Sequence, residues 1–160
     1  YKRALAISMA AIKYAFLKQD TNKNIIFNPK EEIKFEGDTG PYLLYSYARA
    51  RSILKKAGGK GGKEKKKEKI KISNVDENEK NILFELSRFD DMVDSSYNGL
   101  SPNVIANYAY NLSKSFNEFY HSTQVIGSDR EELRLEIVSA FSIVLKQSLH
   151  LLGISVIEEM

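Results

Sequence analysis

The residues best suited to binding chemistry form one row on a predicted helix over residues 42–57. Residues three or four apart share a helix face, so Tyr42, Tyr45 and Arg49 lie together, away from the apolar stripe of the same helix. Tyrosine rings stack on nucleic-acid bases, and an arginine guanidinium binds phosphate or stacks on a ring. The same tyrosines could instead pack against a neighbouring helix, because tyrosine is commonly half-buried. The row therefore has two interpretations, an RNA-binding face or a packing surface.

No other set of residues predicts a reaction. The chain has no cysteine, and its two histidines, His121 and His150, have no evident partners. The glycines at 58–62 lack the preceding strand and the Lys-Ser/Thr pair of a phosphate-binding loop. The neighbouring carboxylates at 31–32 and 90–91 point apart on any regular element, so they form no acid–base pair. We therefore predict no catalytic, cofactor-binding or metal site in this chain.

Positive charge is concentrated in one short segment. The formal net charge is +3, but residues 58–72 alone hold seven lysines and two glutamates, a net charge of +5. The rest of the chain is therefore slightly acidic, at −2. Overall charge gives a poor case for nucleic-acid binding, so any RNA contact must be local. The lysine-rich segment is predicted to be a solvated, flexible loop.

Length and composition indicate a folded domain. The 160 residues are 42% hydrophobic, which is enough for a core, and no apolar run approaches the ~20 residues that a membrane span requires. The sequence begins at Tyr1 without a methionine or a signal-peptide pattern. We expect a piece of a longer protein that is not bound to a membrane.

Apolar residues at helical spacing predict an all-α, antiparallel helical bundle with a short irregular N-terminal segment. Asp76 with Glu79, and Ser128 with Glu131, have the spacing of capping boxes, and Gly153 is expected to stop the last helix. The predicted inward stripes are Leu5, Met9, Ile12 and Phe16 in the first helix; Ile82, Leu86, Phe89 and Val93 in the third; Ile105, Ala109, Leu112, Phe116 and Phe119 in the fourth; and Leu133, Ile137, Ala140, Val144 and Leu151 in the fifth.

Three motifs resemble the arginine–tRNA ligases. Residues 35–49 read F-E-G-D-T-G-P-Y-L-L-Y-S-Y-A-R, similar to the segment that joins the catalytic and anticodon-binding regions of that family. Residues 116–120 read F-N-E-F-Y, followed by Val125, and the chain closes with L-L-G-I from 151 and a final Met160. The sequence departs from the family pattern at Leu44, where glutamine is common, and at Ile157, where proline is common.

The resemblance assigns each part of the chain to a region of the family's proteins. Residues 1–34 resemble the end of the region that links to a catalytic domain, and residues 35–160 resemble the anticodon-binding bundle, with the lysine-rich loop at 58–72. The family's catalytic motifs lie before this segment, so ATP would bind outside this chain and the chain alone would be inactive. The implied partner is tRNA of the arginine isoacceptors, bound by a cytoplasmic monomer.

The resemblance also assigns contacts with tRNA. The turn that reaches toward the anticodon loop corresponds to residues 35–39, and Tyr120 corresponds to an anticodon-contacting tyrosine. Gln124 replaces an aromatic residue of some members, which favours hydrogen bonding over stacking there. The full implied set is Phe35, Gly37, Asp38, Thr39, Tyr42, Tyr45, Arg49, Tyr120, Gln124 and Met160.

Two alternatives stay open at this point. A cysteine or methionine ligase of the same class shares a helical bundle, although the T-G-P-Y segment is not expected there. A protein-interaction module derived from a ligase would bury Tyr42, Tyr45 and Arg49 against a helix or another protein. The burial of this face therefore discriminates between the interpretations.

Overall fold

The computed structural model describes residues 2–58 and 75–160, which are helical and contain no β-strand. The predicted all-α class is thereby confirmed. Most of the predicted lysine-rich loop, residues 59–72, lies outside the described residues. The helices are α1 (Lys2–Leu17), α2 (Pro29–Glu32), α3 (Gly40–Gly58), α4 (Glu77–Ser87), α5 (Phe89–Gly99), α6 (Asn103–Ser122) and α7 (Glu131–Leu151).

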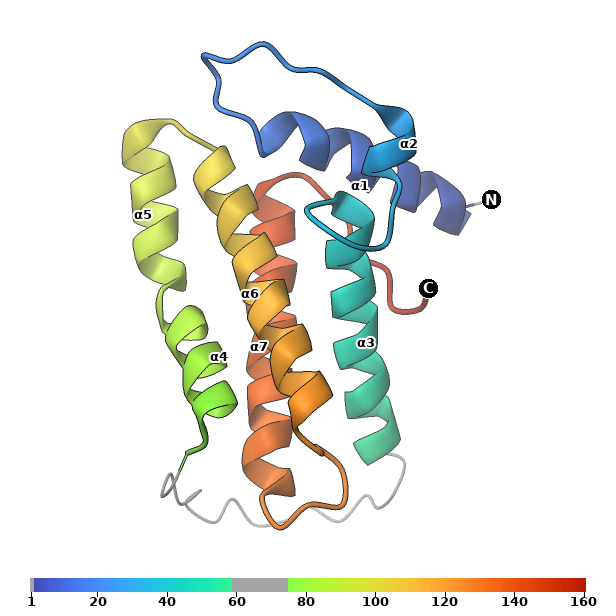
Figure 1. Ribbon diagram of the computed structural model, residues 1–160, viewed down its shortest axis with the longest axis vertical. Coiled ribbons are helices and arrows are strands. Elements are labelled where there is room, and N and C mark those ends of the chain that lie inside the picture. Colours follow the sequence, from blue (N-terminus) through green and yellow to red (C-terminus); the bar gives the residue numbers. More distant parts are fainter. Residues whose placement is uncertain (1, 59–74) are drawn as a thin grey trace.

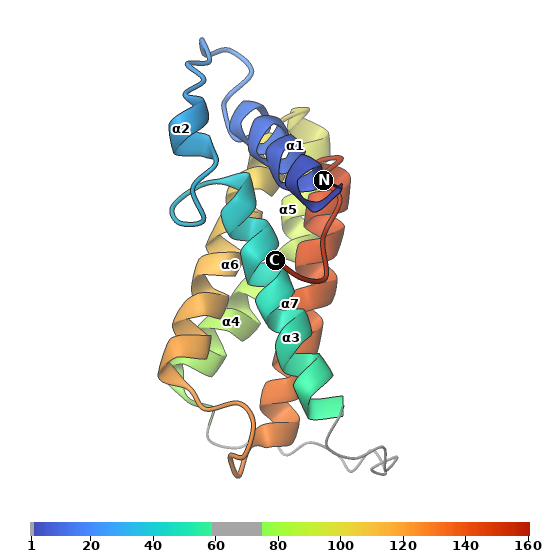
Figure 2. The ribbon, with the colours of Figure 1, turned by 90° about the vertical axis from the view of Figure 1, so that its right-hand side faces the viewer.

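The bundle is made of long helical segments that lie side by side, and α1 lies across one end of it (Figures 1 and 2). These segments are α3, the pair α4 and α5 placed end to end, α6 and α7. Each segment runs antiparallel to the segment that follows it in the chain (Figure 1). The rings of Phe116 on α6 and Phe141 on α7 stack at a centroid separation of 3.8 Å, and both side chains are fully buried. This contact joins α6 and α7 within the core.

The turn before α3 fixes how α3 meets α1. The Thr39 hydroxyl accepts a hydrogen bond from the Tyr42 backbone amide at 3.3 Å, and Pro41 follows in the first helical turn, where its missing N–H costs nothing. A side chain at Gly40 would place its Cβ 2.3 Å from the carbonyl oxygen of Ala10. Glycine is therefore required here, because the start of α3 lies directly on the α1 backbone.

The predicted inward stripe of α1 is wrong. Leu5, Met9, Ile12 and Phe16 are 53%, 43%, 41% and 45% exposed, and they face away from the bundle. The buried side instead carries three alanines and one tyrosine, and alanine lies where the backbone of α1 approaches Gly40, because that contact leaves no room for a larger side chain. These buried residues are Ala10, Ala11, Tyr14 and Ala15.

The capping box of α4 is confirmed. The Asp76 carboxylate accepts from the Glu79 amide at 2.8 Å, and the Glu79 carboxylate accepts from the Asp76 amide at 3.1 Å. The helix predicted from there through Val93 is two helices, with a break at Arg88. The Arg88 amide donates to carbonyls at 85 and 86, which closes α4 before α5 begins. The predicted stripe of α6 is confirmed, with every member at most 3% exposed.

For α7, the predicted capping box is wrong and the predicted stripe is only partly confirmed. The Ser128 hydroxyl donates to the Val125 carbonyl and caps no helix amide, and the Glu131 carboxylate accepts from the Gly127 amide. Leu133 and Ile137 of the predicted stripe are buried, but the stripe then drifts out of the core, so that Leu151 is 54% exposed. The helix does end before Gly153, whose φ of +66° is the left-handed conformation expected there. The buried face is Leu133, Ile137, Val138, Phe141, Leu145 and Leu149.

Within the described ranges, no helix is long and apolar enough to cross a membrane.

Candidate functional site

A groove of about 860 Å³ runs between α3, the end of α6 and the C-terminal residues. Its lining brings together Tyr45 and Arg49 on α3, Tyr120 on α6 and Met160 in the tail, three segments that are 40 to 115 positions apart in the sequence. All four were predicted from the sequence as binding residues. Their shared location is a tertiary feature, because the fold places the α6 end and the tail beside the same face of α3.

Arg49 lies between two tyrosine rings. Its guanidinium carbon is 4.5 Å from the ring centroid of Tyr45 and 4.9 Å from that of Tyr120. The guanidinium also donates to the Tyr45 hydroxyl and, at 2.6 Å, to the Asn117 side-chain oxygen. These partners are neutral, and no carboxylate of the described residues forms an ion pair with Arg49. The positive charge therefore stays available to an anionic ligand in the groove.

Asn117 holds this arrangement from the α6 side and is only 9% exposed. Its amide nitrogen donates to the hydroxyls of Tyr42 and Ser46, both at 2.9 Å, while its oxygen accepts from Arg49. Asn117 lies in the F-N-E-F-Y motif, but its spacing in the sequence indicated no role for it. One buried amide thus fixes the position of three side chains on α3.

Tyr42 differs from the other members of its row. Its ring packs against Tyr110 at a centroid distance of 5.9 Å, and burial raises the pKa of its hydroxyl. Tyr42 does not line the groove. The packing interpretation therefore describes Tyr42, whereas Tyr45 and Arg49 line the groove itself.

The C-terminal residues are held against α3 by ion pairs. Arg51 Nε donates to the Glu158 carboxylate at 2.8 Å, and Lys55 pairs with Glu159 at 3.1 Å. The hydrogen bond from Arg51 holds the pKa of Glu158 below its ordinary value. Ile154 is buried just before these pairs, so the tail packs on the bundle. Met160, 38% exposed, is thereby kept at the groove.

The turn at residues 35–39 is held apart from the groove. The Tyr14 hydroxyl donates to Asp38 at 2.5 Å, and burial raises the pKa of Tyr14, which keeps it protonated as a donor. The Lys18 ammonium donates to the Asp38 backbone carbonyl at 2.7 Å. Gly37 has a φ of +74°, which a turn here requires. None of these residues lines the groove; several line a shallower depression of about 520 Å³.

Two more predicted residues of this turn have contrasting environments. Phe35 is 50% exposed and open to a ligand. Thr39 is buried, and its hydroxyl donates to the Lys34 carbonyl at 2.6 Å. The Thr39 side chain is therefore committed to the turn that starts α3.

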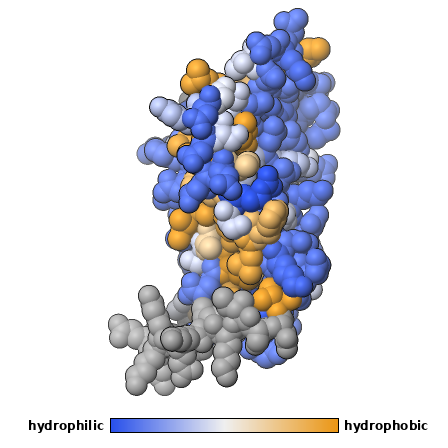
Figure 3. Space-filling view, turned by 90° about the vertical axis from the view of Figure 1, so that its left-hand side faces the viewer, coloured by the Kyte–Doolittle hydropathy of each residue, from blue (hydrophilic) through white to orange (hydrophobic). Residues whose placement is uncertain are grey.

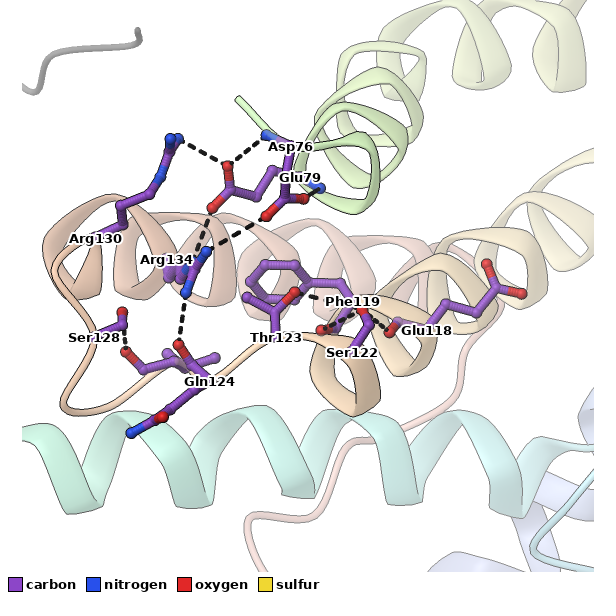
Figure 4. Close-up of polar contacts among 11 residues, drawn as sticks. Asp76, Glu79, Glu118, Phe119, Ser122, Thr123, Gln124, Ser128, Arg130 and Arg134 are labelled. Atoms are coloured by element: carbon purple, nitrogen blue, oxygen red, sulfur yellow. Dashed lines mark hydrogen bonds and ion pairs between the residues drawn. The ribbon is translucent and has the colours of Figure 1, made fainter. Parts of the chain in front are cut away.

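Gln124 lies on the loop between α6 and α7 and is exposed (Figure 4). Its amide nitrogen donates to the Ile126 carbonyl at 3.0 Å, within the same loop. The backbone carbonyl of Gln124 accepts a hydrogen bond from the Arg134 guanidinium at 2.9 Å, which ties the loop to α7. Gln124 does not line the groove, so the fold separates it from Tyr120 despite their closeness in sequence.

A buried charge cluster anchors this loop and the start of α4 (Figure 4). The Glu79 carboxylate, fully buried, pairs with Arg134 and Arg130, each at 2.8 Å. Arg134 also reaches Asp76 at 3.4 Å. The sequence predicted Glu79 only as part of a helix cap, because nothing in local spacing indicated that Arg130 and Arg134 would be its counter-ions.

Among residues 2–58 and 75–160, no three histidine, cysteine, aspartate or glutamate side chains are grouped closely enough to hold a metal ion.

Comparison with known proteins gives a family and a set of relatives. A family model described as the DALR anticodon binding domain matches residues 43–160. An arginine–tRNA ligase of Clostridium acetobutylicum is 38% identical over 157 residues, which cover 96% of this chain and 27% of that protein. One of Parabacteroides distasonis is 36% identical, covering 98% of this chain and 27% of that protein. The chain thus spans about a quarter of the length of these relatives.

Solved structures agree with these matches. The Thermus thermophilus arginyl-tRNA synthetase superposes with a TM-score of 0.89 at 33% identity, covering 99% of this chain and 27% of that one. The arginyl-tRNA synthetase of Plasmodium falciparum gives a TM-score of 0.84 at 26% identity, covering 99% of this chain and 28% of that one. The arrangement of helices is therefore shared along nearly the whole chain.

Proposed function

Because the chain belongs to the DALR anticodon-binding family, and its relatives are arginine–tRNA ligases, we propose that it recognises arginine tRNA as the anticodon-binding part of such a ligase. The observation that carries this proposal is the Tyr45–Arg49–Tyr120 stack inside an open groove. The other features of the groove add to this proposal.

The groove offers complementary contacts to a single-stranded loop. Bases unstacked from a tRNA loop can lie against tyrosine rings, and Tyr120 is 38% exposed. The Arg49 guanidinium has donors left after its two neutral partners, and these can bind a phosphate or a base edge. Glu158 and Glu159 pair with Arg51 and Lys55 along the same groove, whereas Arg49 keeps neutral partners and Lys56 adds a second positive charge to the lining. This distribution favours a defined contact over diffuse attraction.

Electrophoretic binding of this chain to arginine tRNA, against a tRNA with a different anticodon, tests the proposal. We expect arginine tRNA to bind at least about tenfold more tightly, since each specific base contact is typically worth about 1–3 kcal/mol. Tyr120→Ala should weaken this binding, while Tyr97→Ala on α5, which is 77% exposed and outside the groove, should not. Equal binding of both tRNAs, or none, would instead favour the protein-interaction module.

We place the ligation reaction, and with it the binding of ATP, outside this chain. The proposed reaction of the whole protein joins arginine to its tRNA using ATP, and this chain supplies only the recognition of tRNA. Arginine-dependent ATP–pyrophosphate exchange by the 160-residue chain alone would contradict this assignment. We further propose that the protein acts as a monomer in the cytoplasm, where tRNA is charged for translation.

A further inference from the structure

The outer face of α1 carries large apolar side chains that remain about half exposed. Leu5, Met9, Ile12 and Phe16 are each between 41% and 53% exposed. Their spacing of four, three and four residues places them within about 60° of one another around the helix axis. We call these four residues the outer stripe. They form one continuous ridge, because i, i+3 and i, i+4 side chains are neighbours on a helix surface.

The opposite side of the same helix is already buried. Ala10, Ala11, Tyr14 and Ala15 are at most 3% exposed and contact the bundle, and they lie about 180° around the axis from the outer stripe. A helix at the surface of a globular protein needs one apolar face, whereas a helix that is apolar on both sides is typical of an interior. The position of α1, across the end of the bundle, leaves the outer stripe free to be covered (Figures 1 and 2).

The segment after α1 extends the apolar surface. Phe27 stacks on Phe16 with a centroid distance of 5.7 Å and an angle of 19° between the rings. Ile26, the residue before it, is 92% exposed, and Ile25 is 40% exposed. Two hydrophobic segments thus meet at Phe16 rather than dispersing over the surface. Gathered apolar side chains of this kind mark an interaction site.

We infer that the outer stripe docks on the remainder of the polypeptide in a full-length arginine–tRNA ligase, and this inference rests on the proposed function. The chain corresponds to 27% of the length of its relatives, so most of such a protein lies outside it. The docking therefore takes place within one molecule and holds the anticodon-binding bundle at a fixed orientation to the catalytic part.

The size of the stripe favours this occupant over a second copy of the chain. Four half-exposed side chains of this size offer roughly 350 Å² of apolar surface, whereas a stable interface between separate proteins buries about 800 Å² on each partner. A tethered partner needs far less surface, because the connecting chain keeps it at a high effective concentration.

Hydrogen exchange of the α1 amides tests the inference. In the full-length ligase we expect them to exchange at least about tenfold more slowly than in the 160-residue chain, because docking suppresses local opening. Leu5→Gln with Ile12→Gln should remove this extra protection in the full-length protein. A matched control pair, Phe84→Gln with Ile143→Gln, changes residues that are 63% and 58% exposed and should leave it intact. Phe84 belongs to α4. Apolar side chains also gather on the side of the molecule that α4 and α5 form (Figure 3).

The 160-residue chain provides the second arm. Both pairs of substitutions should leave its melting temperature nearly unchanged, since all four positions are exposed. Equal exchange of α1 in both proteins would overturn the inference. Self-association of the 160-residue chain that Leu5→Gln with Ile12→Gln abolishes would also overturn it, in favour of a second copy. Binding of arginine tRNA by the 160-residue chain is measured in parallel, so a failure of the proposed function is recognised separately.

Discussion

Two clusters of side chains in this molecule contain arginine, and they differ in whether a carboxylate neutralises its charge. Arg134 and Arg130 meet the buried carboxylate of Glu79, whereas Arg49 meets two tyrosine rings and an amide in an open groove. In the first cluster the positive charges are matched by a carboxylate within the fold, so they stabilise the junction of α4 and α7. In the second cluster the charge is oriented but not neutralised. An arginine held by neutral partners is ready to bind an anion, and one held by carboxylates is not.

The largest expected effect lies in the buried cluster. Glu79→Ala should destabilise the fold by about 3–5 kcal/mol, because it leaves two arginines without their buried counter-ion. In a chain of this size that lowers the melting temperature by roughly 10 °C, measured by circular dichroism. Glu77→Ala is the control, since its ion pair with Lys80 is exposed and should contribute little. Equal melting temperatures for the two variants would refute the structural role of the cluster.

A change in the groove should act on binding and leave the fold nearly intact. Arg49→Ala should weaken the binding of arginine tRNA by about 1–3 kcal/mol, because it removes the free positive charge and the stack between the tyrosines. Lys114→Ala removes one exposed charge outside the groove and controls for net charge. A fall of many degrees in the melting temperature of Arg49→Ala, with binding unchanged, would place Arg49 with the structural arginines.

The lysine-rich segment sharpens the contrast between oriented and unoriented charge. Replacing Lys63, Lys65, Lys66, Lys67 and Lys69 with glutamine should weaken all tRNAs alike and reduce the salt dependence of binding, because phosphate contacts carry no sequence information. Binding titrations at several salt concentrations measure both effects. A loss confined to arginine tRNA would assign these lysines to specific recognition, beside Arg49.

The smallest effect concerns the exposed pair of Arg51 and Glu158. Since the hydrogen bond from Arg51 lowers the pKa of Glu158 in the folded chain, this contact is fully formed above the ordinary carboxylate value of 4.5 and is lost as pH falls through the lowered value. An NMR titration should therefore give Glu158 a midpoint below 4.5 and show the tail loosening at that pH. Arg51→Gln should return the midpoint toward the ordinary value. An unchanged midpoint in this variant would mean that Arg51 does not hold the tail.

Helix caps, helix ends and helical periodicity could be predicted from the sequence without knowledge of the fold. The capping box at Asp76 and Glu79, the stripe of α6 and the stop before Gly153 all follow from local interactions or helical spacing, and all were predicted. Helical spacing also isolated Tyr45 and Arg49 from the apolar stripe of α3. These features depend on short-range hydrogen bonds and on periodicity, which the order of residues specifies directly.

Which apolar face turns inward was decided by tertiary contacts. The stripe of larger side chains on α1 was predicted to face inward but is exposed. The backbone contact with Gly40 admits only small residues, here Ala10 and Ala11, on the inward side at that point. Likewise, Asn117 became the hub that orients Arg49, and Glu79 received Arg130 and Arg134 as counter-ions, only when segments 51 to 75 positions apart came together. A contact of this kind depends on the distance between helices and on the space left for a side chain, and neither quantity is encoded in the spacing along one helix.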